Sequence, residues 1–412
     1  MRPYHNQKVL MTMAPKDICI GIYTGEGASH SWIWFGEILD RMGFHHVSFL
    51  SEGLLKQVMP EEFDVLVISG GDTFEIAGIL GEKGAKSLRT FIEEGGTFIG
   101  TCAGAYLPLN SSKTPLNLFN FVPAKIANLK DNLPECTALS EKFCTPYGCR
   151  YIYHAVRESV KIRGAGEYPF DFFSEIEAPL YGGPPILPCE DIKVLAYYSD
   201  FTPQTVFLVA PSIARETLIG KVAALRKDMG KGKIYLFGPH LEHPYFPEAN
   251  GLLGKLILGC QRSKGDEKQK GKDQGASSYS SDSLEIFRSL KGEVSNGRIM
   301  ASGLAQKRLS WKIGNKLWEA EKAVYFFETV WKKMNFVEKH LDEGIDSKRL
   351  VDILQLARTS FNSLKDLKDA MEKDEDTLSL AEVLFRELRT LCSEFMQLYF
   401  DLRLAYGYHS GH

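Results

Sequence analysis

Short apolar runs alternate with amphipathic stretches over the first 260 residues. The apolar runs, which we expect to be strands, are 17–23, 46–50, 65–69, 97–101, 194–198, 205–209 and 233–237. The stretch 29–42 between the first two has helical spacing of apolar residues. Strands that alternate with helices predict an α/β fold, with a mostly parallel, flavodoxin-like sheet covered by helices on both faces. Ligands of such sheets bind beyond the carboxyl ends of the strands.

A different pattern occupies the C-terminal third of the chain. No proline follows residue 298, and apolar residues recur with a period near 3.6 over 320–341, 350–371 and 384–402. Ser379 and Glu382 have the spacing of a capping box at the start of the third stripe. This pattern predicts a bundle of three amphipathic helices within 284–412, whose role would be docking or oligomerisation.

Residues 261–283 separate the two patterns. This segment is rich in Lys, Gly, Gln, Asp and Ser, and Tyr279 is its single aromatic residue. Such a composition buries too little apolar surface to offset its chain entropy. We therefore expect an α/β domain over 17–260, a flexible linker over 261–283 and a helical bundle over 284–412.

Composition and charge exclude several classes of protein. The 412 residues are 44% hydrophobic and 25% charged, as in soluble globular proteins. Forty-nine basic against 52 acidic residues give a net charge of −3, so nothing favours nucleic acid or an anionic membrane as a partner. Eight scattered cysteines do not make a disulfide scaffold. With no secretory signal and no apolar run of about 18 residues, we expect a cytoplasmic protein.

The sequence Gly100-Thr-Cys-Ala-Gly-Ala105 carries the strongest chemical signal. It follows the strand 97–101, so Cys102 lies at a strand-to-helix turn, the arrangement of a nucleophile elbow. Small neighbours leave room for such a sharp turn, and the amides at the start of the next helix can donate to an oxyanion. The alternative is a small buried cysteine in a glycine turn.

Two further segments supply what a cysteine nucleophile needs. Gly70 and Gly71 end the strand 65–69, and the amide of Gly71 with that of Ala103 would form an oxyanion hole; the alternative is an ordinary turn. After the strand 233–237 come His240 and Glu242, a base and a carboxylate that could orient it. His243 is a competing base that spacing does not exclude.

These residues together carry a family resemblance. Their order resembles the class I glutamine amidotransferase-like superfamily, and within it the group related to the N-terminal domain of some biotin–protein ligases. The similar segments are 23–28, 100–106, 181–184 and 238–240. The resemblance covers roughly 17–260 and implies a fold of the amidotransferase type with a Cys-His-Glu triad at Cys102, His240 and Glu242.

The resemblance also implies an activity. A member of this superfamily would hydrolyse a C–N amide bond through a thioester, with glutamine as the default small amide substrate and a separate synthetase as the user of the ammonia. The bundle would then dock that synthetase or mediate self-association. The chain has no Gly-Arg-Gly biotinyl-adenylate motif, no P-loop and no dinucleotide fingerprint, so we expect neither biotin transfer nor a cofactor.

Two departures keep other interpretations open. Tyr106 stands where glutaminase subunits commonly have Gln or another substrate-shaping residue, and a long insertion over 111–190 could cover the pocket. Both features favour a non-catalytic binding or regulatory module as the alternative. Residues 71–74 also resemble the glycine turn of dipeptidase-E-like serine peptidases.

The remaining expectations concern metal and truncation. Cys136, Cys144, Cys149 and His154 lack a Cys-x2-Cys knuckle, so we expect no metal site. Because every candidate catalytic residue precedes the linker, we expect a chain that ends near Cys260 to fold and to keep its activity.

Overall fold

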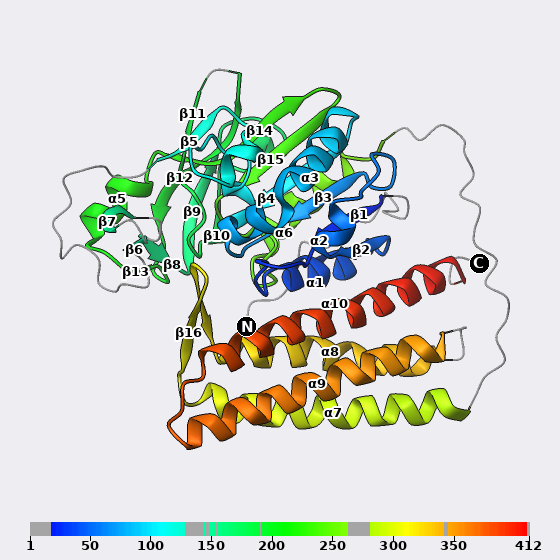
Figure 1. Ribbon diagram of the computed structural model, residues 1–412. Helices are drawn as coiled ribbons and strands as arrows, with labels where there is room; N and C mark the ends of the chain where they lie inside the picture. The colour runs from blue at the N-terminus through cyan, green and yellow to red at the C-terminus, as the bar shows by residue number, and fades with distance from the viewer. Residues whose placement is uncertain are drawn as a thin grey trace.

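The computed structural model describes residues 18–127, 144–145, 148–152, 155–189, 191–262, 281–341 and 345–409. Figure 1 shows an α/β part stacked on a bundle of long helices, with α10 (Leu378–His409) lying along the α/β part. Most of the predicted linker lies outside the described residues, so its flexibility stays a prediction. In the described chain, no helix has an apolar stretch long enough to cross a membrane.

Eleven strands of the described chain form one mixed sheet. In spatial order its main path is β10 (Glu175–Pro179), β9 (Ser159–Gly164), β12 (Lys193–Phe201), β14 (Val222–Met229), β15 (Gly232–Phe237), β4 (Thr97–Thr101), β3 (Val65–Ile68), β1 (Ile20–Tyr23) and β2 (Val47–Leu50). The strands β5 (Ala124–Ile126) and β11 (Ile186–Pro188) pair beside β14. The five strands from β15 to β2 are parallel, and the others pair antiparallel. The predicted α/β fold class is confirmed, and its parallel half contains the strands that lead to the predicted site.

Helices lie between or after the strands of the α/β part. They are α1 (Trp32–Met42), α2 (Glu52–Leu55), α3 (Thr73–Glu93), α4 (Ala103–Tyr106), α5 (Pro211–Leu218) and α6 (Pro247–Leu258), with 3₁₀ turns at Leu116–Phe119 and Phe170–Phe172. Two small sheets pair β6 (Cys144–Thr145) with β7 (Gly148–Ile152) and β8 (Val156–Arg157) with β13 (Val206–Phe207). The strand expected over 205–209 is therefore β13, outside the main sheet.

The described part of the bundle has four helices rather than the expected three. Besides α8 (Glu321–Lys339), α9 (Ser347–Glu372) and α10, it contains α7 (Ser281–Ala305), and a hairpin of β16 (Ser310–Ile313) and β17 (Lys316–Glu319) joins α7 to α8. The sequence analysis missed α7 because serine and glycine, which favour helix weakly, dilute its apolar stripe. One of these glycines has a packing role, since a Cβ on Gly297 would lie 2.3 Å from the Phe327 ring.

The expected capping box at Ser379 is wrong. Helix α10 begins one residue earlier, and the carboxylate of Asp376 accepts a hydrogen bond from the Leu378 amide at 3.0 Å. Ser379 therefore lies inside the first turn. Aspartate and serine are nearly equal as helix caps, so the spacing alone did not distinguish them.

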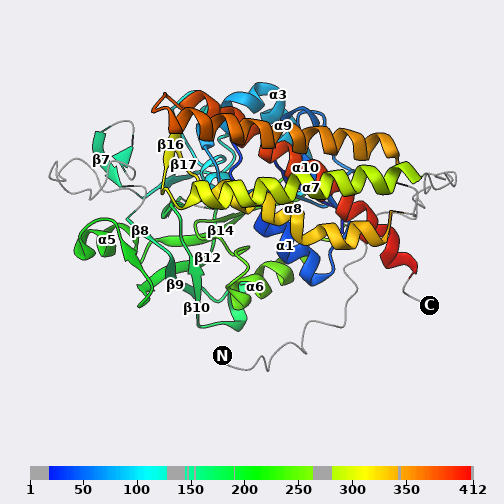
Figure 2. The ribbon, with the colours of Figure 1, turned by 90° about the horizontal axis from the view of Figure 1, so that it is seen from below.

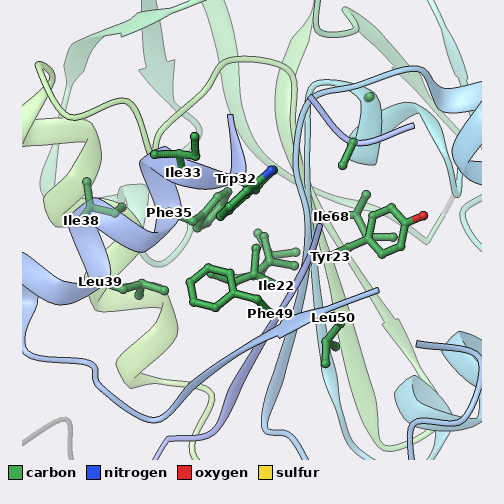
Figure 3. Packing of buried hydrophobic residues seen from close by; sticks show 14 of the residues in the cluster. Ile22, Tyr23, Trp32, Ile33, Phe35, Ile38, Leu39, Phe49, Leu50 and Ile68 are labelled. Atoms are coloured by element: carbon green, nitrogen blue, oxygen red, sulfur yellow. The ribbon is translucent and has the colours of Figure 1, made fainter. Parts of the chain in front are cut away.

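Buried aromatic side chains join the bundle to the α/β part. The ring of Trp32 on α1 lies 5.5 Å from Phe49 of β2 and 6.5 Å from Phe326 of α8. Phe49 in turn lies 5.6 Å from Phe400 of α10. Figure 3 shows Trp32 and Phe49 in the same cluster as Ile22 of the sheet. The two parts therefore share one hydrophobic core.

Charged side chains complete this contact. Asp40 of α1 accepts hydrogen bonds from Lys333, Tyr399 and Arg403 of the bundle. Although burial opposes its charge, hydrogen bonding with His45 and the Lys333 ammonium hold the pKa of Asp40 well below its usual value.

Beside the glycine turn at 25–27, a second ion pair joins the two parts. The almost completely buried Arg389 side chain of α10 pairs with Glu26 at 2.7 Å. Together with the Asp40 cluster, this pair places charged contacts at separate points along the junction.

This packing argues against the expected independence of residues 17–260. A chain that ends near Cys260 exposes Trp32 and Phe49, and the Asp40 carboxylate loses its three hydrogen-bond donors from the bundle. We now expect that truncation to lower stability and to promote aggregation.

We expect Phe400→Ala to lower the free energy of unfolding by about 3 kcal/mol, because it leaves a cavity beside Phe49 in the shared core. Chemical denaturation of the full chain measures the loss. Leu378→Ala is the control, since Leu378 lies on the same helix but is exposed. Equal effects of the two substitutions would contradict a shared core.

Candidate active site

The backbone at Cys102 has the conformation of a sharp strand-to-helix turn. Cys102 follows β4 directly and precedes α4, with φ 51° and ψ −108°, a region that L-residues seldom occupy. The flanking glycines are required by close packing: a Cβ on Gly104 would lie 1.8 Å from the Ile68 carbonyl oxygen, and one on Gly100 would lie 2.3 Å from that of Gly104. Strained backbone of this kind concentrates at functional sites.

Strand pairing brings the His240 segment beside Cys102. β15 runs parallel to β4, Phe237 pairs with Thr101, and the Cys102 amide donates to the Phe237 carbonyl at 3.0 Å. Three residues later, His240 is 2% exposed and Glu242 is completely buried. Two segments that lie far apart in sequence therefore meet at the carboxyl edge of the sheet.

A short buried hydrogen bond orients the imidazole. Nδ1 of His240 lies 2.6 Å from Oε1 of Glu242, and the same oxygen accepts from the Thr101 hydroxyl at 2.9 Å. The Cys102 side chain is a further neighbour of His240 that raises the pKa of the imidazole. Because Nδ1 faces the carboxylate, Nε2 is the ring nitrogen left for the thiol. The geometry is that of a nucleophile, a base and an orienting carboxylate.

The charge state of His240 follows from this environment. Burial disfavours the imidazolium, but the Glu242 carboxylate and the neighbouring Cys102 side chain outweigh burial and raise the pKa of His240 to about 10. His240 is therefore protonated at neutral pH. It is positioned to give a proton to a leaving group.

The competing base, His243, has a different environment. Burial and the nearby charges of His240 and Lys322 lower its pKa to about 4. Its Nδ1 accepts a 3.4 Å hydrogen bond from the Tyr245 amide, and its ring centroid lies 4.4 Å from that of Trp34. Among the described residues it has no carboxylate partner. The structure thus favours His240 over His243 as the base.

The two expected oxyanion donors lie on adjacent turns. Gly71 pairs with Ala28 in an isolated antiparallel bridge. The hydrogen bonds of this bridge join the neighbouring residues: the Ser29 amide donates to the Gly70 carbonyl, and the Asp72 amide donates to the Gly27 carbonyl. This pattern directs the Gly71 amide away from the bridge. Ala103 is the first residue of α4, where amides have no partner within the helix. Both amides are thus positioned at helix-forming turns that flank Cys102.

The sequence analysis did not identify the aromatic wall of this site. The Trp34 ring lies 5.3 Å from His240, 5.1 Å from His30 and 6.0 Å from Tyr181, measured between centroids. Trp34 lies in the first turn of α1, which follows β1. Its position just after a parallel strand was the one feature of the sequence that could have indicated a place at the site. In the sequence, its apolar spacing marked it only as a core residue.

Tyr106 and the insertion over 111–190 meet beside the cysteine. The Tyr106 hydroxyl donates to the Gly182 carbonyl at 3.0 Å, and the Cys102 thiol lies 3.8 Å from the Tyr181 carbonyl oxygen. A Cβ on Gly183 would lie 1.7 Å from the Gly238 carbonyl oxygen, so this turn packs tightly on the His240 segment. The insertion therefore supplies one wall of the site. Cys102 itself is 9% exposed.

The cysteines considered as zinc ligands are only partly within the described residues. Cys144 and Cys149 lie on β6 and β7, whereas Cys136 and His154 fall outside the described ranges. Within those ranges, no three potential ligand side chains gather in a group that could hold a metal ion.

One protein family matches part of the chain. The family described as "Biotin-protein ligase, N terminal" matches residues 20–114, which include Gly71, Cys102 and Ala103 but not His240. This match confirms the resemblance to the N-terminal domain of biotin–protein ligases over that part of the chain. No curated protein matches the sequence.

Solved structures show weaker likeness. A glutamine amidotransferase is 14% identical over 58% of this chain and 97% of its own, with a TM-score of 0.37. A glutamine amidotransferase from Thermotoga maritima is 10% identical over 54% and 76%, with a TM-score of 0.35. A beta-galactosidase from Bacillus circulans is 12% identical over 59% of this chain and 31% of its own, with a TM-score of 0.32. Likenesses at these TM-scores carry no argument about function.

We expect Gly104→Ala to destabilise the folded protein by more than about 2 kcal/mol, because its Cβ collides with the Ile68 carbonyl. Gly78→Ala is the matched control in helix α3, where the nearest neighbour of the new Cβ is 3.8 Å away. Thermal and chemical denaturation measure both changes. A Gly104→Ala protein as stable as the Gly78→Ala protein would mean that the elbow is less tightly packed than described.

The raised pKa of His240 makes stability depend on pH. Its interaction with Glu242 stabilises the fold fully below about pH 6.5, the ordinary histidine pKa, and is lost as the pH rises toward the folded-state pKa of about 10. We expect the wild-type free energy of unfolding to fall across this window by more than that of Glu242→Gln. Urea denaturation at several pH values compares the two proteins, and parallel curves would contradict the charge pairing.

Proposed function

We propose that this protein is a cysteine-dependent amidohydrolase of the glutaminase-like kind, in which Cys102, His240 and Glu242 act as a triad. The observation that carries the proposal is the short Glu242–His240 contact beside a cysteine in strained backbone. A thiol, an imidazole and a carboxylate in this order are the groups that acyl transfer through a covalent intermediate requires.

The geometry supports the following steps. The Cys102 sulfur bonds to the carbonyl carbon of the amide while the amides of Gly71 and Ala103 donate to the oxyanion. As the C–N bond breaks, the His240 imidazolium gives its proton to the leaving nitrogen, which departs as ammonia or an amine. The thioester remains on Cys102. His240 then takes a proton from water as the water oxygen attacks the thioester carbon; the C–S bond breaks, the carboxylic acid leaves, and Cys102 is restored as a thiolate beside the His240 imidazolium.

Two features that each cost folding free energy support a catalytic role over a non-catalytic scaffold. A positive φ at a residue with a side chain costs about 1–3 kcal/mol. A buried imidazolium–carboxylate pair also repays its desolvation poorly as a source of stability. A cysteine turn that served only packing requires neither of them. Tyr106, the departure that favoured a scaffold, holds the 181–183 turn through its hydroxyl and leaves the triad intact.

We expect Cys102→Ala to lower hydrolysis of glutamine by more than about 10³-fold, because a covalent mechanism without its nucleophile keeps only the residual rate of binding and oxyanion stabilisation. Ammonia release measures the rate, and mass spectrometry of the protein with an electrophilic glutamine analogue detects the adduct on Cys102. Cys189→Ala, at an exposed cysteine, is the control. A Cys102→Ala protein that releases ammonia at the wild-type rate would refute the proposal.

A further inference from the structure

The segment before α1 holds the glycine turn of the candidate site through buried serine residues. The hydroxyls of Ser29, Ser31 and Ser69 form a buried chain, in which the Ser31 oxygen lies 3.0 Å from each of the other two. The Ser31 hydroxyl also accepts a 2.8 Å hydrogen bond from the Gly70 amide. Ser29 adds a second contact, because its amide donates to the Gly70 carbonyl at 2.9 Å. Both backbone polar groups of Gly70 are therefore bound by this segment.

The opposite side of the same turn is bound to the nucleophile elbow. The Ser69 carbonyl accepts a hydrogen bond from the Gly104 amide at 3.0 Å. Further along the turn, the Thr73 hydroxyl donates to the Ala103 carbonyl at 3.2 Å. Gly71 lies between these two contacts in the chain, so the turn that carries it is held against the start of α4.

These contacts determine the direction of the Gly71 amide. In a trans peptide, the carbonyl and the N–H that follows it point in opposite directions. The 69–70 peptide directs its carbonyl to the elbow and its N–H to Ser31. The 70–71 peptide has the reverse orientation, because its carbonyl is bound by the Ser29 amide. Its N–H, which belongs to Gly71, therefore faces the side on which the elbow lies.

Ser31 stands at a position where a serine usually has another role. It is the N-cap residue of α1, where a serine hydroxyl ordinarily accepts a hydrogen bond from an amide in the first turn of its own helix. Within the described chain, the Ser31 side chain makes no such bond and binds Gly70 instead. The helix itself is anchored, since Trp32 packs on Phe326 of α8, and Figure 1 and Figure 2 show α1 beside the helices of the bundle. Ser31 is therefore a fixed support for the turn.

We propose that Ser31 is a positioning residue for the oxyanion hole. By binding the Gly70 amide, its hydroxyl keeps the Gly71 amide aimed at the oxygen of a carbonyl group under attack by Cys102. This inference rests on the proposed function and adds to it a residue from the loop before α1. Without the hydroxyl, the buried Gly70 amide loses its acceptor, and a rotation of the turn is the way to recover one. Oxyanion stabilisation requires donors that are already in place, so such a rotation slows acyl transfer.

Two reagents that modify Cys102 by different routes test this inference in the full chain. With iodoacetamide, the thiolate forms a C–S bond at the methylene carbon as iodide leaves, and no oxyanion develops. With p-nitrophenyl acetate, the thiolate adds to the carbonyl carbon, an oxyanion forms, and p-nitrophenolate leaves an acetyl thioester on the sulfur. Mass spectrometry of acid-quenched samples measures each rate at Cys102 relative to exposed Cys189. The acylation preference is the relative rate with the ester divided by the relative rate with iodoacetamide.

We expect Ser31→Ala to lower the acylation preference about tenfold and to leave the iodoacetamide rate unchanged, a smaller loss than removal of an oxyanion donor itself causes. A merely structural role would slow both reactions together. Ser31→Cys, which is similar in shape but has sulfur as a weak acceptor, is expected to lower the preference as well. Ser87→Ala is the matched control, because it removes a partly buried hydroxyl that binds the Leu55 and Val58 carbonyls late in α3, and it is expected to change nothing.

The contrary outcomes are distinct. If Ser31→Ala slows both reagents equally or changes neither rate, the positioning role is refuted while Cys102 stays a reactive nucleophile. A wild-type acylation preference no greater than one would refute it too, since it would show no oxyanion stabilisation. If wild-type Cys102 reacts with neither reagent, the proposed function and this inference both fail. Thermal unfolding verifies that each variant is folded, and Ser31→Cys decides the test should Ser31→Ala be unfolded.

Discussion

The buried contact between His240 and Glu242 is the interaction on which the candidate site depends. It exists because β15 pairs in parallel with β4, which sets Phe237 beside Thr101 and carries both following loops to one edge of the sheet. The Thr101 hydroxyl, one residue before the cysteine, holds the same carboxylate oxygen as His240. A shift of one residue in this register would turn the side chains on β15 to the opposite face and separate the triad. The register of the sheet therefore determines the geometry of the candidate site.

The bundle also helps to determine the geometry of the candidate site, because it contacts the turns at this edge of the sheet. Its helix α10 covers β2 with Phe400 and pairs Arg389 with Glu26, while its hairpin holds Asp72. Glu26 and Asp72 follow β1 and β3, so these contacts fall on the carboxyl edge of the sheet, next to Cys102. A change in the position of the bundle would act directly on the turns near Cys102.

The sequence predicted the parts of the fold whose signals are local. Runs such as 65–69 and 97–101 became β3 and β4, and the small residues around Cys102 marked a turn whose close packing the structure explains. The hairpin, α7 and the wall at Trp34 were not predicted, because their placement depends on long-range packing rather than on spacing.

The enclosure of Cys102 also has a chemical consequence. The insertion contributes the carbonyl of Tyr181 and α1 contributes Trp34, and Cys102 is only 9% exposed. The proposed thioester would be shielded from bulk water in such a site, which limits side reactions of the intermediate. A large folded protein cannot reach a cysteine enclosed in this way, whereas a small amide can. The walls formed by Trp34 and Tyr181 therefore fit the small amide that we propose as the substrate.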